Sequence, residues 1–195
     1  MKTKFFYMLL ILGLFACNNV SEQQIGEEVQ GIIVKTDKEY LEEGKMIAES
    51  TFKVLSSNLQ QAMAEGGIEN ALSYCNVNAM PLTDSLSKHY NVAIKRVSDK
   101  ARNQLNLASK NEQKIIDNYL ASTENRKPVL EQNENGKITF YAPIVAKALC
   151  LNCHGIEGEI LSSENNEKIK LLYPEDKAIG YSEGDLRGVW SIMFN

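Results

Sequence analysis

The sequence predicts an α+β domain in which helices come first and strands follow. Three observations support this prediction. Apolar residues recur at helical spacing from Asp37 to Met63. Residues 92–97 and 137–144 then show the alternation that is typical of half-buried strands. An apolar segment from Leu186 to Phe194 predicts a closing strand.

Three helices are expected in the N-terminal half. Asp37 can serve as the N-cap of the first helix, and Gly66-Gly67 ends it, because glycine disfavours a helix interior. A second helix is expected from Ile68 to Ala79. Pro81 begins a short third helix that ends near His89, because proline is tolerated in a first helical turn. One face of the second helix carries Ala71, Leu72 and Cys75.

The second half mixes a helix with strands. Residues 109–112, Ser-Lys-Asn-Glu, form a capping-box pattern that predicts a helix to about Ala121. Residues 133–136 predict a turn before the strand at 137–144. Residues 145–149 then lead into a short cysteine motif.

The first 16 residues have the features of an export signal. Two lysines precede the apolar run 5–15, which is shorter than the roughly 20 residues that a spanning helix needs. Its ending, Leu-Phe-Ala before Cys17, resembles a bacterial lipobox, which implies cleavage before Cys17 and a diacylglycerol on its sulfur. An ordinary secretory signal is the alternative. We therefore expect a lipoprotein anchored at the periplasmic side of a membrane, with a polar tether at 17–37 and a folded domain at 38–195.

Composition narrows the functional class. The formal net charge of −4 becomes −6 when the two lysines of the signal are removed, since that segment has no acidic residue. An acidic surface argues against a nucleic-acid partner. The two histidines do not suggest a Ser/His/Asp set, and no glycine-rich phosphate loop is present, so no enzymatic activity is expected.

The most informative segment is Cys150-Leu-Asn-Cys153-His154, because C-x-x-C-H is the attachment sequence for c-type haem. The two thiols would form thioethers with the haem vinyl groups, and the histidine would provide an axial nitrogen to the iron. One covalent haem c is therefore the expected cofactor. Bacteria attach haem to this motif outside the cytoplasm, so the motif and the export signal agree.

The cysteine count leaves one thiol unassigned. Of four cysteines, the lipid takes Cys17 and the haem takes two, which leaves Cys75. An unpaired cysteine on an apolar helical face is either a small core residue or a ligand. Two alternatives without haem are a Cys150–Cys153 dithiol and a zinc site of Cys75, Cys150, Cys153 and His154. Adjacent cysteine and histidine ligands are awkward around one zinc ion.

Seven segments of the chain carry a resemblance to a known family: 71–75, 94–98, 101–103, 141–144, 149–155, 176–181 and 184–191. They resemble a family of exported single-haem c-type domains with a PAS-like sensor fold. The order and approximate spacing of these segments fit that family over residues 40–195, and the resemblance implies a PAS-like antiparallel sheet with one covalent haem. The sequence departs from the family after Arg102-Asn103, where related domains often have prolines.

The resemblance also implies a second axial ligand. The family has a cysteine at the position of Cys75, opposite the histidine of the motif, so Cys75 and His154 would bind the two sides of the iron. A thiolate ligand favours a low redox potential and can be lost on reduction. His89 lies in a polar stretch and is expected at the surface. The apolar helical positions of Met46, Met63 and Met80 predict core residues instead.

Other residues are candidates for contact with the haem. Arg96, Arg102 and Arg187 could pair with the haem propionates, or lie at the surface and pair strands. Tyr141 and Pro143 could line the haem face, or pack in the core, and Trp190 is expected in the core.

Two functions are compatible with these expectations. The first is a lipid-anchored redox- or ligand-sensing haem module. The second is a monohaem electron-transfer cytochrome at the membrane surface. The sequence contains no recognisable output segment, so either function needs a separate protein partner.

Overall fold

The computed structural model describes residues 35–122, 124 and 126–195. The expected export signal, Cys17 and nearly all of the tether lie outside these residues. The described part is α+β, with helices and a four-stranded antiparallel sheet, as the sequence predicts. Within it, no helix combines the length and apolarity that a membrane crossing requires.

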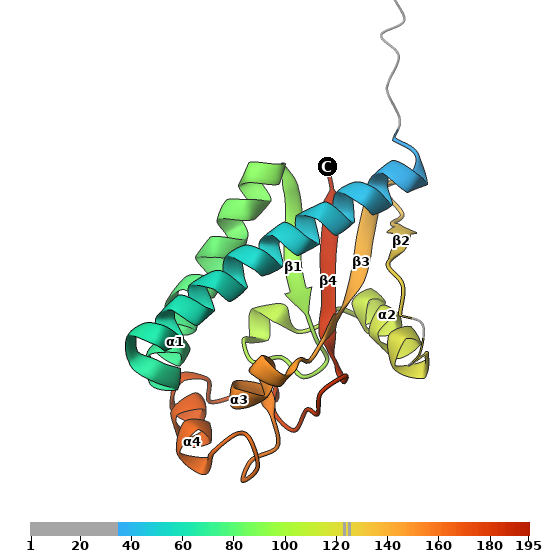
Figure 1. The fold of residues 1–195 in the computed structure, drawn as a ribbon. Helices are drawn as coiled ribbons and strands as arrows, with labels where there is room; N and C mark the ends of the chain where they lie inside the picture. Colours follow the sequence, from blue (N-terminus) through green and yellow to red (C-terminus); the bar gives the residue numbers. More distant parts are fainter. Residues whose placement is uncertain (1–34, 123, 125) are drawn as a thin grey trace, which may run out of the picture. The chain divides into compact units, whose positions relative to one another are not determined.

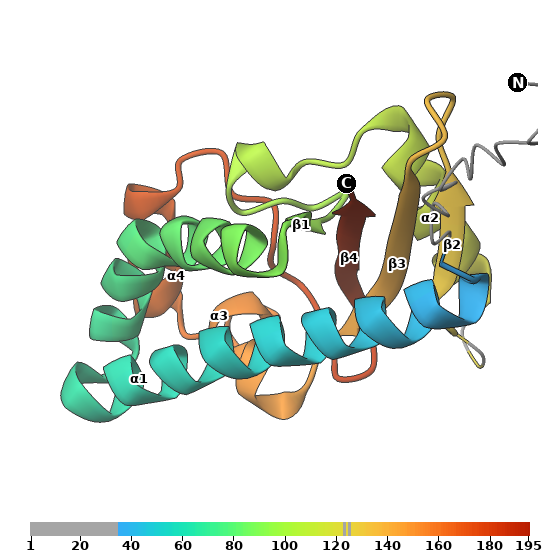
Figure 2. The same cartoon turned by 90° about the horizontal axis from the view of Figure 1, so that it is seen from above.

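Helix α1 (Asp37–Tyr90) is bent into two arms (Figures 1 and 2). Gly66 and Gly67 have non-helical dihedral angles, which confirms the expected break; we call residues 37–65 the first arm and residues 68–90 the second arm. The N-cap prediction is wrong by one residue. Thr36 is the cap, because its hydroxyl accepts from the Glu39 amide while the Glu39 carboxylate accepts from the Thr36 amide, in a complete capping box.

The second arm continues through Pro81, so the prediction of a separate third helix is wrong. Proline lacks the amide that would donate to the carbonyl four residues earlier, in Val77. Val77 is 67% exposed, so water can take the place of that donor. The second arm is therefore one continuous helix, and it carries Cys75.

The sheet has the strand order β1-β4-β3-β2. Its outer strands are β1 (Val92–Val97) and β2 (Val129–Gln132), and its inner strands are β3 (Ile138–Val145) and β4 (Leu186–Phe194). β1 and β4 have the predicted bounds, β3 differs by one residue at each end, and β2 was not predicted.

Helices cover both faces of the sheet. Helix α1 packs on one face, where its Ile47 joins a cluster with Ile94, Phe140, Trp190 and Ile192 of the sheet. Helix α2 (Lys110–Ala121) packs on the other face, and its predicted capping box between Ser109 and Glu112 is confirmed. Burial of each such large apolar side chain contributes about 1.5–3 kcal/mol. Trp190 lies in the core as expected, whereas Met46 is 46% exposed and the prediction that it is a core residue is wrong.

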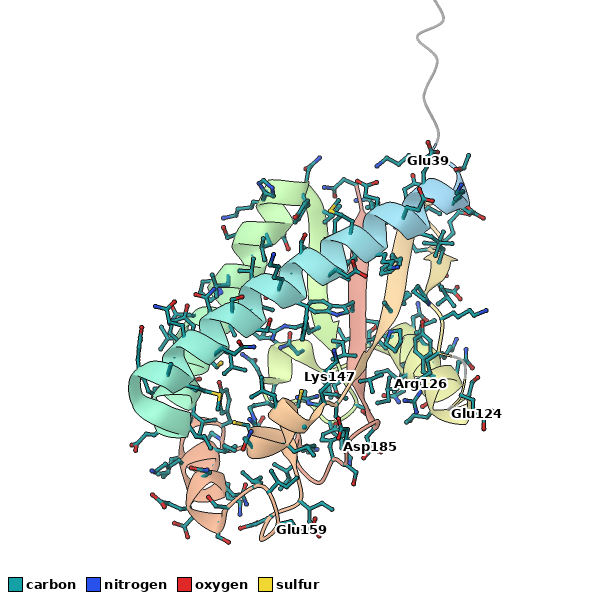
Figure 3. All side chains as sticks on the ribbon, in the orientation of Figure 1. Glu39, Glu124, Arg126, Lys147, Glu159 and Asp185 are labelled. Atoms are coloured by element: carbon teal, nitrogen blue, oxygen red, sulfur yellow. The ribbon has the colours of Figure 1, made fainter. Side chains whose placement is uncertain are left out.

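The cysteine motif lies at one end of the sheet, near the bend of α1 (Figure 1). The 3-10 helix η2 (Ala148–Cys150) runs directly into the single turn α3 (Leu151–His154), and α4 (Ser163–Leu172) follows. A further 3-10 helix, η1 (Gln104–Asn106), comes after β1. Figure 3 shows Lys147 and Asp185 near the point where β3 ends and β4 begins, and the Ala146 amide donates to the Asp185 carbonyl at 2.8 Å there.

Candidate haem site

The motif residues are held on one short helical segment. Cys150 ends η2, and Cys153 and His154 belong to α3. Residues three apart on a helix lie on the same side, so this turn presents the two thiols together. Leu151, between them in sequence, is 5% exposed and packs with Ala146 and Tyr181, which fixes the turn to the domain.

His154 is held in one tautomer by the backbone. Its Nδ1 lies 2.6 Å from the carbonyl oxygen of Ala178. A carbonyl only accepts hydrogen bonds, so Nδ1 carries the proton and Nε2 keeps a free lone pair. Burial holds the pKa of His154 well below its ordinary value, and Arg187 and Arg102 lower the pKa further against the effect of the Ala178 bond. The side chain is therefore a neutral imidazole with Nε2 available to a metal.

Cys75 lies on the second arm of α1, on the side that packs near the motif turn. Leu72, one turn earlier, packs with Leu161, Ile169 and Cys153. Burial raises the pKa of the Cys75 thiol, while Arg96 and Arg102 act in the opposite direction. Burial also raises the pKa of Cys153, opposed by Arg102 and reinforced by the neighbouring cysteines Cys75 and Cys150. The fold thus brings Cys75 within electrostatic reach of the motif.

Three arginines surround these groups. Arg96 faces α1, since its partner in the β1–β4 register is Trp190, and burial lowers the pKa of Arg96. The pKa of His154 is lowered by all three arginines, Arg96, Arg102 and Arg187. The Nε atom of each arginine is buried and has no acceptor among the described residues. A site with three largely buried cationic side chains, each with a buried Nε that has no acceptor, is suited to an anionic group.

A family model described as Tll0287-like matches residues 29–195. This chain belongs to the Tll0287-like family. A solved structure with a similar fold is the crystal structure of the cyanobacterial heme-protein Tll0287, at 18% sequence identity and a TM-score of 0.56. The match covers 82% of this chain and 96% of that protein. No curated protein matched the sequence.

Two predicted site residues of this Tll0287-like chain lie elsewhere. Tyr141 is buried against Ile115 and Ile116 on the face that α2 covers. Pro143 lies two residues after Tyr141 on β3 and so faces the same side of the sheet. Its partner on β4 is Val189, which packs in the cluster that contains Tyr141. The structure does not bring Tyr141 or Pro143 together with Cys75, Arg96 and His154.

Sequence reasoning missed several residues that this member of the Tll0287-like family places at the site. The ring of Tyr181 meets the His154 ring edge-on, at 6.5 Å between centroids, and Arg187 lies over the Tyr181 ring. Asp176 binds Arg102, and Tyr173 lies under the Arg102 guanidinium. The resemblance of segment 176–181 to the family was the one signal for Asp176 and Tyr181, and no sequence signal pointed to Tyr173.

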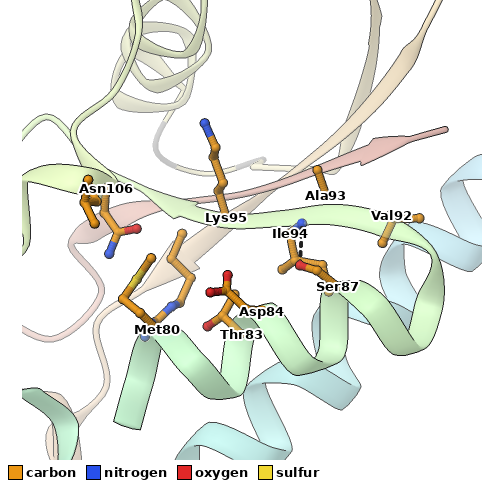
Figure 4. A pocket seen from close by; sticks show the side chains of 11 residues that line it. Met80, Thr83, Asp84, Ser87, Val92, Ala93, Ile94, Lys95 and Asn106 are labelled. Carbon is orange, nitrogen blue, oxygen red and sulfur yellow. Dashed lines mark hydrogen bonds between the residues drawn. The ribbon is translucent and has the colours of Figure 1, made fainter. Parts of the chain in front are cut away.

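The surface near the site has a cavity of about 360 Å³ between the second arm and β1 (Figure 4). Its lining includes Met80, Thr83 and Asp84 from α1 and Lys95 from β1. Ser87 closes one side, where its hydroxyl accepts from the Ile94 amide at 3.0 Å. Arg96 lines this cavity and also lies near His154. No cysteine or histidine lines the cavity, so it is separate from the candidate ligands.

The geometry does not favour the zinc alternative. Cys75, Cys150 and Cys153 are all free thiols, which is compatible with haem attachment and with a Cys150–Cys153 dithiol. Among the described residues, no three His, Cys, Asp or Glu side chains are grouped closely enough to hold one metal ion. His89, the other histidine, is exposed at the end of the second arm, as expected.

Proposed function

We propose that this chain is a c-type haem protein, anchored by lipid on Cys17 at the periplasmic side of a membrane, that responds to redox state or to a small ligand. The observation that carries the proposal is the arrangement at His154: Nδ1 donates to Ala178, which leaves Nε2 free, directly after two thiols on one helical turn. The haem-protein neighbour and the family support haem as the cofactor. No enzymatic reaction and no nucleic-acid partner is part of the proposal.

The residues present fit a haem. Cys150 and Cys153 would hold it by thioethers, and His154 and Cys75 would be its axial ligands. Arg96 has a buried Nε without an acceptor, and its guanidinium makes no hydrogen bond or ion pair among the described residues, so it is the first candidate to bind a propionate; Arg187 is the second. When bound, the haem would supply exchange of single electrons.

Cys75 supplies the argument for a response rather than a simple electron carrier. Burial favours the neutral thiol of Cys75, whereas Arg96 and Arg102 favour the thiolate. Burial is the larger effect and raises the pKa of Cys75, so the protein favours the neutral thiol, and a change of charge at the centre would decide whether Cys75 stays a ligand. A PAS-like sensor role agrees with the four-stranded sheet, and a monohaem electron carrier is the second candidate.

Spectroscopy of the full chain, expressed with the cytochrome c maturation machinery, tests the proposal. We expect a Soret band, haem that remains attached on a denaturing gel, and a low-spin EPR signal of thiolate ligation. Cys75→Ser should keep the covalent haem and lose the thiolate signal. Met80→Leu, which removes the sulfur of a neighbouring residue on the same arm, is the control and should change neither.

Each part of the proposal has a result that would contradict it. A wild-type protein without a Soret band would reject haem binding altogether. An unchanged EPR spectrum in Cys75→Ser would reject Cys75 as a ligand while leaving the haem assignment intact. Fast reversible reduction with no ligand loss would favour the electron carrier, and a protein that stays in the membrane fraction after Cys17→Ala would reject the lipid anchor.

A further inference from the structure

The segment 176–181 is bound to the motif turn by several hydrogen bonds. Besides the bond from His154 Nδ1 to Ala178, the Gly180 amide donates to the Gly155 carbonyl at 2.9 Å. The Tyr181 amide donates to the His154 carbonyl at 3.0 Å. The orientation of the His154 ring therefore depends on how this segment is held.

Asp176 holds the segment. Its Oδ1 accepts from the Ala178 amide at 2.8 Å, which closes a turn and aims the Ala178 carbonyl at His154. Its Oδ2 accepts from Arg102 Nη2 at 3.0 Å. The Asp176 side chain is only 4% exposed, so both carboxylate oxygens are used inside the domain.

Arg102 connects this turn to the motif. The same Nη2 donates to the Cys153 carbonyl at 2.7 Å and lies 3.4 Å from the Ala178 carbonyl, which is also the acceptor of His154. Its side chain is 12% exposed. A buried ion pair is weak evidence for stability, because the cost of desolvation offsets much of the attraction. The contacts of this pair, all near one imidazole, point to a role at the site.

We propose that the buried Arg102–Asp176 pair positions His154 and sets its strength as an electron donor, so that the charge of Asp176 offsets that of Arg102 beside the haem iron. This inference rests on the proposed haem function. Groups that accept from the outer nitrogen of a ligating histidine orient it and raise its basicity, and their loss typically changes metal affinity by about 10–100-fold. Arg102 and Asp176 are positioning residues, since neither is proposed to bind the iron.

The test is the midpoint potential of the holoprotein in a set of charge variants. Asp176→Asn keeps an oxygen that can accept from the Ala178 amide but removes the negative charge. With Arg102 then unbalanced, ferrous iron is favoured, and we expect the ferrous-to-ferric ratio at a fixed ambient potential to rise about tenfold, a shift of about 59 mV for one electron.

Arg102→Gln removes the positive charge and should shift the ratio about tenfold in the opposite direction. The double variant, Arg102→Gln with Asp176→Asn, is neutral and should return the potential close to the wild-type value. Glu175→Gln removes an exposed carboxylate next in sequence and is the control, which should leave the potential unchanged.

The orienting role has its own readout. Asp176→Ala loses the turn as well as the charge, so amide hydrogen exchange in residues 176–181 of the holoprotein should be faster than in Asp176→Asn. Shifts of the same sign in both single variants, or shifts no larger than that of Glu175→Gln, would overturn the inference. If Asp176→Asn does not fold, the sign of the Arg102→Gln shift decides. If every variant holds covalent haem but its potential does not shift, the inference about Arg102 and Asp176 is rejected and the proposed function stands. A wild-type protein without haem would instead reject the proposed function.

Discussion

Gly44 determines how closely the first arm of α1 approaches the sheet. It is a buried helical glycine, and a Cβ built on it would overlap the ring of Phe140, reaching Cδ2 at 2.5 Å and Cβ at 2.8 Å, and Cγ at a still shorter distance. Phe140 is fully buried in β3 among Ile47, Ile192 and their neighbours, so its ring has little room to move. We therefore expect Gly44→Ala to destabilise the domain, although alanine is the better helix former.

Two effects of opposite sign give the magnitude. Alanine in place of glycine within a helix stabilises by about 1 kcal/mol. An extra methyl group in a well-packed core costs about 1–3 kcal/mol, and the fully buried ring of Phe140 argues for the upper end of that range. The net loss in free energy of unfolding should be about 2 kcal/mol, which lowers the melting temperature of a domain of this size by about 4–8 °C.

Chemical denaturation monitored by circular dichroism measures this change. Phe140→Ala alone should cost about 3–5 kcal/mol, because it leaves a cavity. In the double variant the methyl group introduced by Gly44→Ala occupies part of that cavity, so the two losses should fall short of additivity by about 2 kcal/mol. Additive losses, or a Gly44→Ala protein as stable as the wild type, would refute the close approach of α1 to Phe140.

Three further predictions concern stability. Asn166 is 1% exposed, and neither of its amide atoms has a partner among the described residues, so Asn166→Leu should raise the free energy of unfolding by about 1–3 kcal/mol; a loss in the same denaturation assay would show that the amide is satisfied in solution. Burial raises the pKa of Tyr119 to about 12, and its hydroxyl donates to the Lys127 carbonyl at 2.8 Å. The unfolded chain loses this proton first, near pH 10, so the stability from Tyr119 is present below pH 10 and is lost as the pH rises towards 12. Tyr119→Phe should reduce this alkaline loss by about 2 kcal/mol in denaturation curves from about pH 9 to 12, and an unchanged pH profile would contradict the assignment. Gly67 has a φ of 68° that L residues rarely adopt, so Gly67→Ala should cost about 1–3 kcal/mol of stability, and a neutral effect in thermal melts would argue against the bend between the two arms.

The elements that the sequence predicted well are those with local signals. β1 and β4 combine apolar runs with clear ends, and the α2 capping box is a pattern of four residues. β2 escaped prediction because it is a short edge strand whose residues are mostly exposed, so burial imposes no pattern on them. Pro81 was misleading because the first-turn rule for proline ignores an exposed position at which water can replace the lost donor.

The residues of the candidate site also differ in whether a local sequence pattern could predict them. The motif at 150–154 is local, so its thiols and histidine could be identified from five consecutive residues. The bond from His154 to Ala178 and the pair of Arg102 with Asp176 join segments distant in sequence, which no local pattern encodes. Tyr141 shows a third limit, since alternation along a strand separates two faces but does not say which face meets the site.

The charges at the site bear on the choice between haem and zinc. Arg96, Arg102 and Arg187 lie around a neutral His154, and Asp176 is the carboxylate paired with one of them, Arg102. A divalent cation placed beside these guanidinium groups would add like charge in a poorly solvated site, which is unfavourable. A haem would instead bring two propionates, and Cys75 would add a thiolate, so that the added charges oppose those already present. The arginines therefore argue for an anionic cofactor independently of the C-x-x-C-H motif, and Arg96, with its unused donors, is the residue at which this argument is most direct.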